Sequence, residues 1–342
     1  MKQMIKQLLF VLLFLACLVA AVLLFLPDTC PVRSYIMKSV QAPSMHEEHS
    51  PEDDELVSTE KVPHVLTQNI VAGEWNTYHG GNALQGVAEG TLPDELVVLW
   101  SVLAGAAVRQ PPVLHNGVIV AVNAHSEAFA LTIDGNELWR TTLQAPDPAF
   151  EDGRDVYIEA PIMALGDKVV LGTDMGDVAA LDINTGEAYW WTNIGGPVRG
   201  APNYSDDGSK LFVINQDMGS LLCLDTGSGK KLWESPGPDR SDASPAVADD
   251  VAVYGSCASA LHVIDLVSGS HLHDIVIEAG GGQIAGGVAL LDGFAYAGVR
   301  DGRVVCADIK AGEFKWTTSI SEMEVFCTPA VNTDWVIVTD YD

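Results

Sequence analysis

Two histidines of this 342-residue sequence, His271 and His273, are spaced as metal ligands on a strand would be. Their imidazoles are expected on one face, because side chains alternate along a strand. Two ligands alone do not make a zinc site, which takes three or four protein ligands. His273 also occupies a position where similar segments of the chain carry Trp. We therefore predict that His273 packs in place of an aromatic residue and that the pair binds no metal.

Acidic turns offer carboxylate oxygens, the second kind of metal ligand in this sequence. They lie at residues 174–177, 217–219 and 301–302. Ca²⁺ takes six to eight oxygen ligands, and none of these turns has the spaced acidic set of a calcium-binding loop. The sequence also contains no Ser-His-Asp order, phosphate-binding loop or HExxH motif. We predict ordinary hairpin turns and no catalytic, cofactor-binding or metal-binding residues.

Six cysteines are spread along the chain without an adjacent pair or a Cys-x-x-Cys motif. Cys223 and Cys306 stand in strand positions where small apolar residues belong, so we expect them to pack as buried thiols. Export from the cytoplasm would permit a disulfide, but the sequence does not assign its partners.

A repeated phrase shows which elements must position these residues. It is clearest in residues 172–190, where glycine-containing turns flank a predicted strand at residues 178–182. The phrase ends in Gly-x-x-x-Trp, usually with an Asp four residues before the Gly. Its aromatic positions are Trp139, Trp190, Trp233 and Trp316, with Trp100 upstream and His273 in a degenerate copy. Its turn positions are Asp182, Gly186, Asp225, Gly229, Asp265, Gly269, Asp308 and Gly312.

The starts of the repeats set the period of the fold. Prolines recur at positions 112, 161, 202, 245 and 329, and Gly286-Gly287 replaces the proline in one copy. A period of about 40–45 residues with several short strands is typical of a β-propeller blade. One blade cannot bury both faces of its sheet, so neighbouring blades must stack. We predict an all-β fold of four-stranded antiparallel blades at residues 112–143, 159–194, 200–234, 243–277 and 286–319, with a truncated sixth at 325–342.

Residues 180–190 resemble the repeat of the pyrroloquinoline-quinone-like (PQQ-like) β-propeller family, whose signature is Ala-Leu-Asp-x-x-Thr-Gly-x-x-x-Trp. The resemblance covers residues 75–342. It implies a ring of seven or eight blades, so we expect this chain to be a fragment of one. It also implies that the repeated Trp residues dock neighbouring blades. Residues 75–82 resemble the family's segment before the first blade, and residues 96–101 are predicted to be a strand that closes the ring.

The resemblance implies more than one function. Quinone-dependent alcohol dehydrogenases share the blades but hold their quinone over adjacent cysteines, which this chain lacks. We therefore predict no cofactor and a non-catalytic scaffold that binds protein partners through its inter-blade loops. The chain is similar in this respect to the propeller subunit of the outer-membrane β-barrel assembly machinery. A quinoprotein-like oxidoreductase or its remnant, and a ligand-binding sensor ectodomain, are the alternatives.

One inter-blade loop and the overall charge bear on the choice of partner. Residues 144–157 form the longest inter-blade loop, which is a candidate for binding or a disordered acidic segment. The formal net charge of −28 disfavours nucleic acid, because phosphate contacts require basic patches. We expect protein partners and no nucleic acid.

Residues 8–26 form an uncharged, almost wholly apolar run that is long enough to cross a bilayer as a helix. Lys2 and Lys6 precede it, which favours a cytoplasmic position for residues 1–7. We predict an uncleaved signal-anchor, with a cleaved signal peptide as the alternative. Cys17 faintly resembles a lipoprotein cleavage site, but the apolar run continues past it. Residues 27–70 are predicted to be an acidic disordered linker, and residues 71–342 to face the periplasm from the cell membrane.

Overall fold

The computed structural model describes residues 73–90, 95–277 and 282–340. The chain divides into two units, Met1–Glu60 and Lys61–Asp342, and all described residues belong to the second. The predicted signal-anchor at residues 8–26 and the linker at 27–70 lie outside the described residues. Within the described ranges, no helix is long and apolar enough to cross a membrane.

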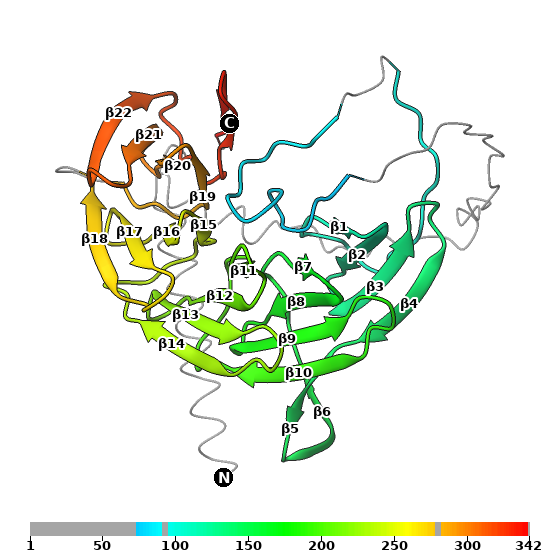
Figure 1. Ribbon diagram of the computed structural model, residues 1–342. Coiled ribbons are helices and arrows are strands. Elements are labelled where there is room, and N and C mark those ends of the chain that lie inside the picture. The colour runs from blue at the N-terminus through cyan, green and yellow to red at the C-terminus, as the bar shows by residue number, and fades with distance from the viewer. Residues whose placement is uncertain (1–72, 91–94, 278–281, 341–342) are drawn as a thin grey trace, which may run out of the picture. The chain divides into compact units, whose positions relative to one another are not determined.

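Five four-stranded antiparallel sheets lie side by side in an arc, with their first strands toward a common axis (Figure 1). Their arrangement confirms the predicted all-β propeller of four-stranded blades. The first sheet comprises β1 (Val113–His115), β2 (Val118–Val122), β3 (Glu127–Thr132) and β4 (Glu137–Thr142). The second comprises β7 (Met163–Leu165), β8 (Lys168–Gly172), β9 (Asp177–Asp182) and β10 (Ala188–Asn193). The third comprises β11 (Asn203–Tyr204), β12 (Lys210–Asn215), β13 (Ser220–Asp225) and β14 (Lys231–Ser235).

The arc continues with two further blades and a short strand pair. The fourth sheet comprises β15 (Ala246–Ala248), β16 (Val251–Gly255), β17 (Ala260–Asp265) and β18 (His271–Val276). The fifth comprises β19 (Val288–Leu291), β20 (Phe294–Gly298), β21 (Arg303–Asp308) and β22 (Glu313–Ser319). β23 (Ala330–Val331) pairs with β24 (Val336–Ile337) at the position of the predicted sixth blade.

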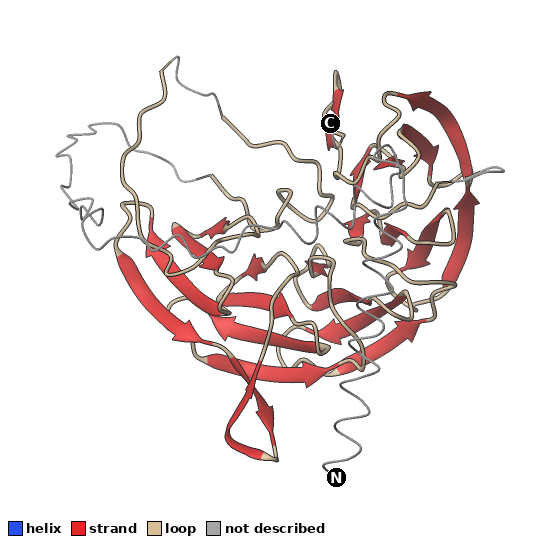
Figure 2. Ribbon diagram, turned by 180° about the vertical axis from the view of Figure 1, so that it is seen from behind, coloured by secondary structure: helices blue, strands red, loops and turns tan. Residues whose placement is uncertain are grey.

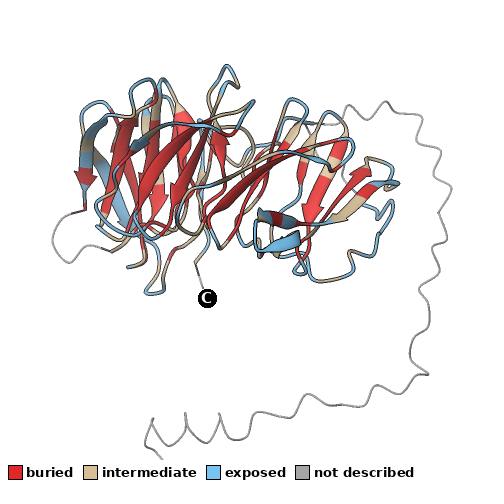
Figure 3. Ribbon diagram, turned by 90° about the horizontal axis from the view of Figure 1, so that it is seen from below, coloured by how far each residue is buried: buried red, intermediate tan, exposed pale blue. Residues whose placement is uncertain are grey.

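Stacking between blades creates the core. The second and third strands of each sheet are almost wholly buried, whereas the turns at the two rims are exposed (Figure 3). The largest buried cluster joins the first two blades through residues such as Val120, Ala130 and Leu171. Because apolar residues fill both faces of the middle strands, each sheet depends on its neighbours, as repeat architectures require.

A β-bulge lies at the same place in every outer strand, one residue before the aromatic position. In the second blade, Ala188 pairs with Leu181 and Trp190 pairs with Ala180, so Tyr189 is the extra residue. A bulge increases the local twist and changes which side chains share a face. The equivalent bulged residues are Leu138, Leu232, Leu272 and Lys315.

The bulge corrects the expectation that His271 and His273 share a face. His271 pairs with Ile264 and His273 pairs with Val263, which leaves Leu272 as the extra residue between them. The imidazole of His271 therefore contacts Asp274 on its own strand. The imidazole of His273 instead contacts the carbonyl of Ile309 in the next blade.

Residues 75–85, called here the central segment, cross the first strands of the blades. Leu84 in this segment is buried in the core shared by the fourth and fifth blades. The segment bonds the first strand of every blade in turn. These contacts join Trp75 to Leu114, Asn76 to Ala164, Asn82 to Asn203 and Val247, Ala83 to Leu290, and Gln85 to Leu290 and Val331. It therefore acts as an internal tie across the blades.

Two loops differ from their sequence interpretation. Residues 144–157 are not a disordered loop, because they contain a hairpin of β5 (Gln144–Asp147) and β6 (Phe150–Asp155), which projects from the arc (Figure 1). Arg154 of this hairpin forms an ion pair with the buried carboxylate of Asp177. Residues 96–101 form no strand in the described structure, and Figure 2 draws them as loop. Within the described residues, no neighbouring strand pairs with their backbone.

Candidate functional site

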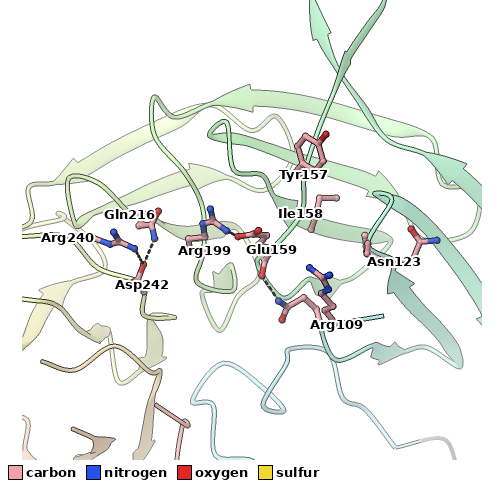
Figure 4. A pocket seen from close by; sticks show the side chains of 12 residues that line it. Arg109, Asn123, Tyr157, Ile158, Glu159, Arg199, Gln216, Arg240 and Asp242 are labelled. Atoms are coloured by element: carbon pink, nitrogen blue, oxygen red, sulfur yellow. Dashed lines mark hydrogen bonds and ion pairs between the residues drawn. The ribbon is translucent and has the colours of Figure 1, made fainter. Parts of the chain in front are cut away.

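A cavity of about 540 Å³ opens near the axis, where the first strands of the blades begin (Figure 4). Its walls come from the segments that precede β1, β7, β11 and β15, and from the β2–β3 and β12–β13 turns. Its lining side chains include Arg109, Gln110, Asn123, Tyr157, Ile158, Glu159, Arg199, Gln216, Arg240 and Asp242. We call this cavity the axial pocket.

Three arginines face the axial pocket, two of them paired with carboxylates. Arg199 forms an ion pair with Glu159, and Arg240 donates to Asp242 at 3.1 Å. Within the described ranges, no carboxylate forms an ion pair with Arg109. The pocket therefore has more guanidinium groups than carboxylates, although the whole chain carries a formal charge of −28. This local excess of positive charge favours an anionic or polar ligand.

A buried amide fixes one wall of the pocket. Gln216 is buried, and its Nε2 donates to the same Asp242 oxygen that accepts from Arg240 (Figure 4). On the opposite wall, Gln110 Nε2 donates to the backbone carbonyl of Glu159 at 2.5 Å. Hydrogen bonds of this kind hold rotamers in place, so the charged groups are presented by an ordered frame.

The repeat itself brings the charged residues of the pocket together. Arg109, Ile158, Arg199 and Asp242 each stand three residues before the proline that opens a blade. Because the blades surround one axis, equivalent positions converge on one ring of side chains. Sequence reasoning missed this site, although three of these four repeats carry a charged residue at this offset from the proline.

The β5–β6 hairpin ends at the same pocket. Tyr157 follows this hairpin, lines the pocket and is largely exposed. A second cavity, of about 340 Å³, shares Gln110, Glu159, Arg199 and Asp242 with the first. Exposed Tyr and Arg side chains at a concave surface are the residue types enriched at the centres of protein interfaces.

The predicted docking residues contact the next blade in a repeated pattern. Trp139 donates from Nε1 to the carbonyl of Ile183 at 2.8 Å, and its ring lies over Gly186. Trp190 donates to the carbonyl of Thr226 at 3.1 Å and lies over Gly229. A side chain at either glycine would collide with the indole.

The pattern also includes residues outside the regular Trp positions. Trp100 donates to the carbonyl of Ile133 at 2.8 Å and lies over Gly135, although residues 96–101 are not a strand. His273 contacts the carbonyl of Ile309 at 2.8 Å, beside Gly312.

Two docking positions depart from the pattern. The indole of Trp233 lies over Gly269, but its Nε1 is buried without a hydrogen-bond partner. Lys210 donates to the carbonyl of Leu266, the group that the pattern would assign to Trp233. Trp316 is partly exposed and contacts Tyr296 of its own blade.

The four predicted turn aspartates share one hydrogen-bonding role. Each accepts backbone N–H groups within its own turn, as in Asp182 with Asn184 at 2.7 Å and Asp308 with Ala311 at 2.8 Å. Asp225 and Asp265 accept in the same way from Ser228 and Ser268. The hydroxyls and N–H groups of those serines hold the pKa of both carboxyls below its usual value. These contacts use the carboxylates to close turns, and the glycine that follows each has a positive φ.

The described cysteines, Cys223, Cys257, Cys306 and Cys327, are free thiols. Burial raises the pKa of Cys223 to about 12, so this thiol is protonated at neutral pH. Cys306 is buried as well. Protonated, buried thiols are poor nucleophiles.

The stacked sheets, the glycine-docked aromatics and the axial pocket define a β-propeller protein built from PQQ-like repeats. A sequence profile described as outer membrane protein assembly factor BamB matches residues 115–342. The chain therefore belongs to this family.

Comparisons with individual proteins are more distant. BamB of Yersinia pestis is 21% identical over 253 residues, which cover 68% of this chain and 63% of that protein. BamB of Vibrio cholerae is 27% identical over 195 residues, covering 57% and 49%. The chain thus spans about half to two-thirds of the length of these curated relatives.

Solved structures show the same fold. BamB from Moraxella catarrhalis superposes with a TM-score of 0.52 at 20% identity, covering 63% of this chain and 62% of that one. A europium-containing methanol dehydrogenase gives a TM-score of 0.59 at 15% identity, covering 72% and 58%. At such identities the likeness concerns the fold, which assembly factors and dehydrogenases share.

Proposed function

We propose that this protein is a non-catalytic scaffold in outer-membrane protein assembly, and that it binds a protein partner at the axial pocket. Family membership supports the biological role. The observation that carries the binding site is the convergence of Arg109, Arg199 and Arg240 on one concave surface of a strongly acidic chain. The partner is expected to insert a polar loop with at least one carboxylate.

A scaffold accounts for the residues better than quinone chemistry does. A quinone site of the dehydrogenase type would need adjacent cysteines, and the sequence contains none. The axial pocket instead offers guanidinium groups paired with Glu159 and Asp242, of which Asp242 also accepts from Gln216, together with the exposed ring of Tyr157. Arginine and tyrosine residues at such places commonly dominate the affinity of protein interfaces.

We further propose that the propeller works outside the cytoplasm, tethered to a membrane through residues 8–26. The support is the apolar run in the sequence and the biological role of the family. In this arrangement, residues 27–70 would give the propeller reach from the membrane surface. Because Tyr157 joins the β5–β6 hairpin to the pocket, we expect the partner to contact both.

Site-specific photo-crosslinking in Gram-negative cells tests the proposal. A photoreactive phenylalanine analogue replaces Tyr157 at the pocket, and in a second strain it replaces Tyr189, which is exposed on β10. We expect a discrete adduct with a component of the outer-membrane assembly machinery only from position 157. Adding Arg199→Glu should reduce its yield at least about tenfold, the effect of a loss of ~1.4 kcal/mol in binding.

Lys231→Glu is the matched control, because it reverses an exposed charge on β14, away from the pocket. This variant should leave the adduct unchanged. Equal adducts from positions 157 and 189, or an adduct unaffected by Arg199→Glu, would contradict binding at the axial pocket.

A further inference from the structure

Blade four holds a cluster of two imidazoles and one carboxylate on its outer half. His262 lies on β17, and His271 and Asp274 lie on β18. Asp274 Oδ1 is 2.6 Å from His262 Nδ1 and 2.6 Å from His271 Nε2. The three candidate ligand atoms all lie within 4.8 Å of one another. We propose that this cluster is a binding site for a divalent transition-metal ion such as Zn²⁺, with water as a fourth ligand.

The strand geometry explains why these three residues meet. Asp274 pairs directly with His262 across the two strands, so their side chains share a face. The bulge at Leu272 then brings His271 onto the same face as Asp274, three residues away. Without the bulge, His271 and Asp274 would point to opposite faces of the sheet, because side chains alternate.

The protonation states suit metal binding at neutral pH. Burial lowers the pKa of His262, despite its hydrogen bond to Asp274, so the imidazole is neutral. Burial raises the pKa of Asp274, but hydrogen bonds from His262 and His271 outweigh this and hold it below its usual value. The carboxylate is therefore ionised. A metal ion takes these ligands as neutral imidazole and carboxylate, so its binding requires the ring protons that face Asp274 to move to the other nitrogens, Nε2 of His262 and Nδ1 of His271.

The surroundings of His262 match a second coordination shell. Its Nε2 lies 2.7 Å from Ser256 Oγ, and the ring of Tyr254 packs against it with centroids 5.1 Å apart. When Nδ1 binds a metal, the Nε2–H donates to Ser256, which fixes the tautomer and the ring orientation. His271 and Asp274 are partly exposed, so an ion can reach the site from solvent.

A hydrolytic triad is the competing interpretation of Ser256, His262 and Asp274. The hydrogen bonds follow the order of such a triad, which sequence order did not reveal. However, Ser256 is buried, its hydroxyl accepts from the N–H of Ala258, and neither cavity described above is lined by it. A nucleophile needs access to substrate, so the cluster is not a hydrolase site.

Blades two and five show that the fold does not require these polar residues. Counting from the signature aspartate, the position of His262 is Ala179 in blade two and Val305 in blade five. The position of Asp274 is Trp191 and Thr317 in the same blades. A fully buried histidine in place of Ala or Val is costly unless it is paired. In blade four, the buried His262 is paired with Asp274, and Asp274 also contacts the imidazole of His271.

The size of the cluster fits a small ion. Ligands about 2.0–2.2 Å from a tetrahedral Zn²⁺ lie roughly 3.3 Å apart. The contacts of 2.6 Å around Asp274 must therefore open by about 0.7 Å to reach this ligand spacing. Partly exposed His271 and Asp274 can move by this amount, because no core packing holds their tips. Imidazole and carboxylate donors favour zinc, copper, nickel and cobalt over calcium.

Metal titration of the purified full chain tests the site. After treatment with EDTA and dialysis, the protein is titrated with Zn²⁺ by calorimetry and with Co²⁺ by visible absorption. We expect a site with a tetrahedral Co²⁺ band that Zn²⁺ displaces. His271→Ala should abolish the band and weaken Zn²⁺ binding at this site at least about tenfold, which even an outer-shell change can cause.

Two further variants separate a metal site from a purely structural network. His125→Ala removes an exposed histidine of blade one and should leave the band and the affinity unchanged. Ser256→Ala keeps all three ligands and should weaken binding about 10–100-fold while retaining the band. A wild-type chain without the Co²⁺ band, or identical binding by wild type and His271→Ala, would overturn the proposal. Thermal melts in EDTA verify that each variant is folded.

Discussion

Single residues decide how closely each blade follows the repeat. In most interfaces the ring N–H of the docking aromatic donates to a carbonyl of the following blade, as Trp139 does to Ile183. Trp233 is the exception, because Lys210 occupies the carbonyl of Leu266. Packing of the partly buried indole against the core of blades three and four offsets the lost hydrogen bond. His273 retains the contact with a smaller ring.

The buried imidazole of His262 predicts a pH dependence of stability in EDTA. Its folded pKa lies below the ordinary value of 6.5, so the unfolded chain takes up a proton first as the pH falls. The free energy of unfolding should be fully retained above pH 6.5 and should decrease as the pH falls below it. Urea unfolding between pH 7.5 and 5 measures this slope, which should be smaller in His262→Gln.

A second, partly buried histidine, His79, provides the comparison for this prediction. Burial also lowers the pKa of His79, so this residue adds a slope of the same sign. His79→Gln should remove the part of the pH slope that His79 contributes and leave the part that His262 contributes. If the slope were the same in wild type and His262→Gln, burial would not hold the imidazole of His262 neutral.

At the scale of elements, each hairpin turn is shaped by the blade before it. The turn glycines have positive φ and also pack against the aromatic ring of the preceding blade, as Gly186 packs against Trp139. The bulge in the preceding outer strand directs that indole toward the turn. The turn, the bulge and the aromatic residue therefore form one packing unit between adjacent blades, which is repeated along the arc.

The double role of Gly186 predicts an unequal effect of alanine at two glycines of blade two. Gly166 has φ +61° and open space around it, so Gly166→Ala should cost only the ~1–2 kcal/mol of left-handed backbone. A methyl group at Gly186 would come within 2.6 Å of Trp139 Cε3. Gly186→Ala should therefore destabilise by about 1–3 kcal/mol more, the cost of overpacking.

Urea unfolding followed by circular dichroism measures both alanine variants. In a Trp139→Leu background, the cost of Gly186→Ala should fall to that of Gly166→Ala. Equal costs in the wild-type background would show that the close contact between Trp139 and Gly186 does not contribute to stability.

For the molecule as a whole, within the unit Lys61–Asp342, the central segment matters most. It bonds the first strand of each blade although it precedes all of them in the chain. Repeat proteins usually gain stability only from neighbouring units. Here the central segment, residues 75–85, adds contacts between one continuous stretch of chain and all the blades, including blades that are not neighbours. It therefore stabilises the arc as a whole.

Leu84 is a buried residue of the central segment, so we predict that its substitution lowers the free energy of unfolding strongly, although it lies outside any strand. It is buried in the core of the fourth and fifth blades. Leu84→Ala should destabilise by about 2–5 kcal/mol, as for other buried leucines. Leu103→Ala, at a residue that is 92% exposed, should change the free energy of unfolding by less than about 0.5 kcal/mol. Thermal melts compare the two, and similar melting temperatures would rule out an anchoring role for Leu84.

The repeat could be predicted from the sequence because its signals are local. Glycine at a positive φ, an aspartate that closes its own turn and alternating apolar strands act within a few residues of one another, as around Asp182 and Gly186. Such patterns survive without knowledge of the partner strands. The β-propeller class, its four-stranded antiparallel blades and the buried thiol of Cys223 therefore followed from composition and spacing.

The sites required contacts between residues far apart in the chain. The axial pocket brings Arg109 and Asp242 together because the blades surround one axis. Their shared offset from a repeated proline marks equivalent positions, but it does not show that those positions meet in space. The His262 cluster depends on a bulge that shifts strand register by one residue, so simple alternation assigned His271 to the wrong face. The central segment looks like a loop in sequence and bonds every blade in space. In each case the deciding interaction is non-local, and its geometry exists only once the sheets have stacked.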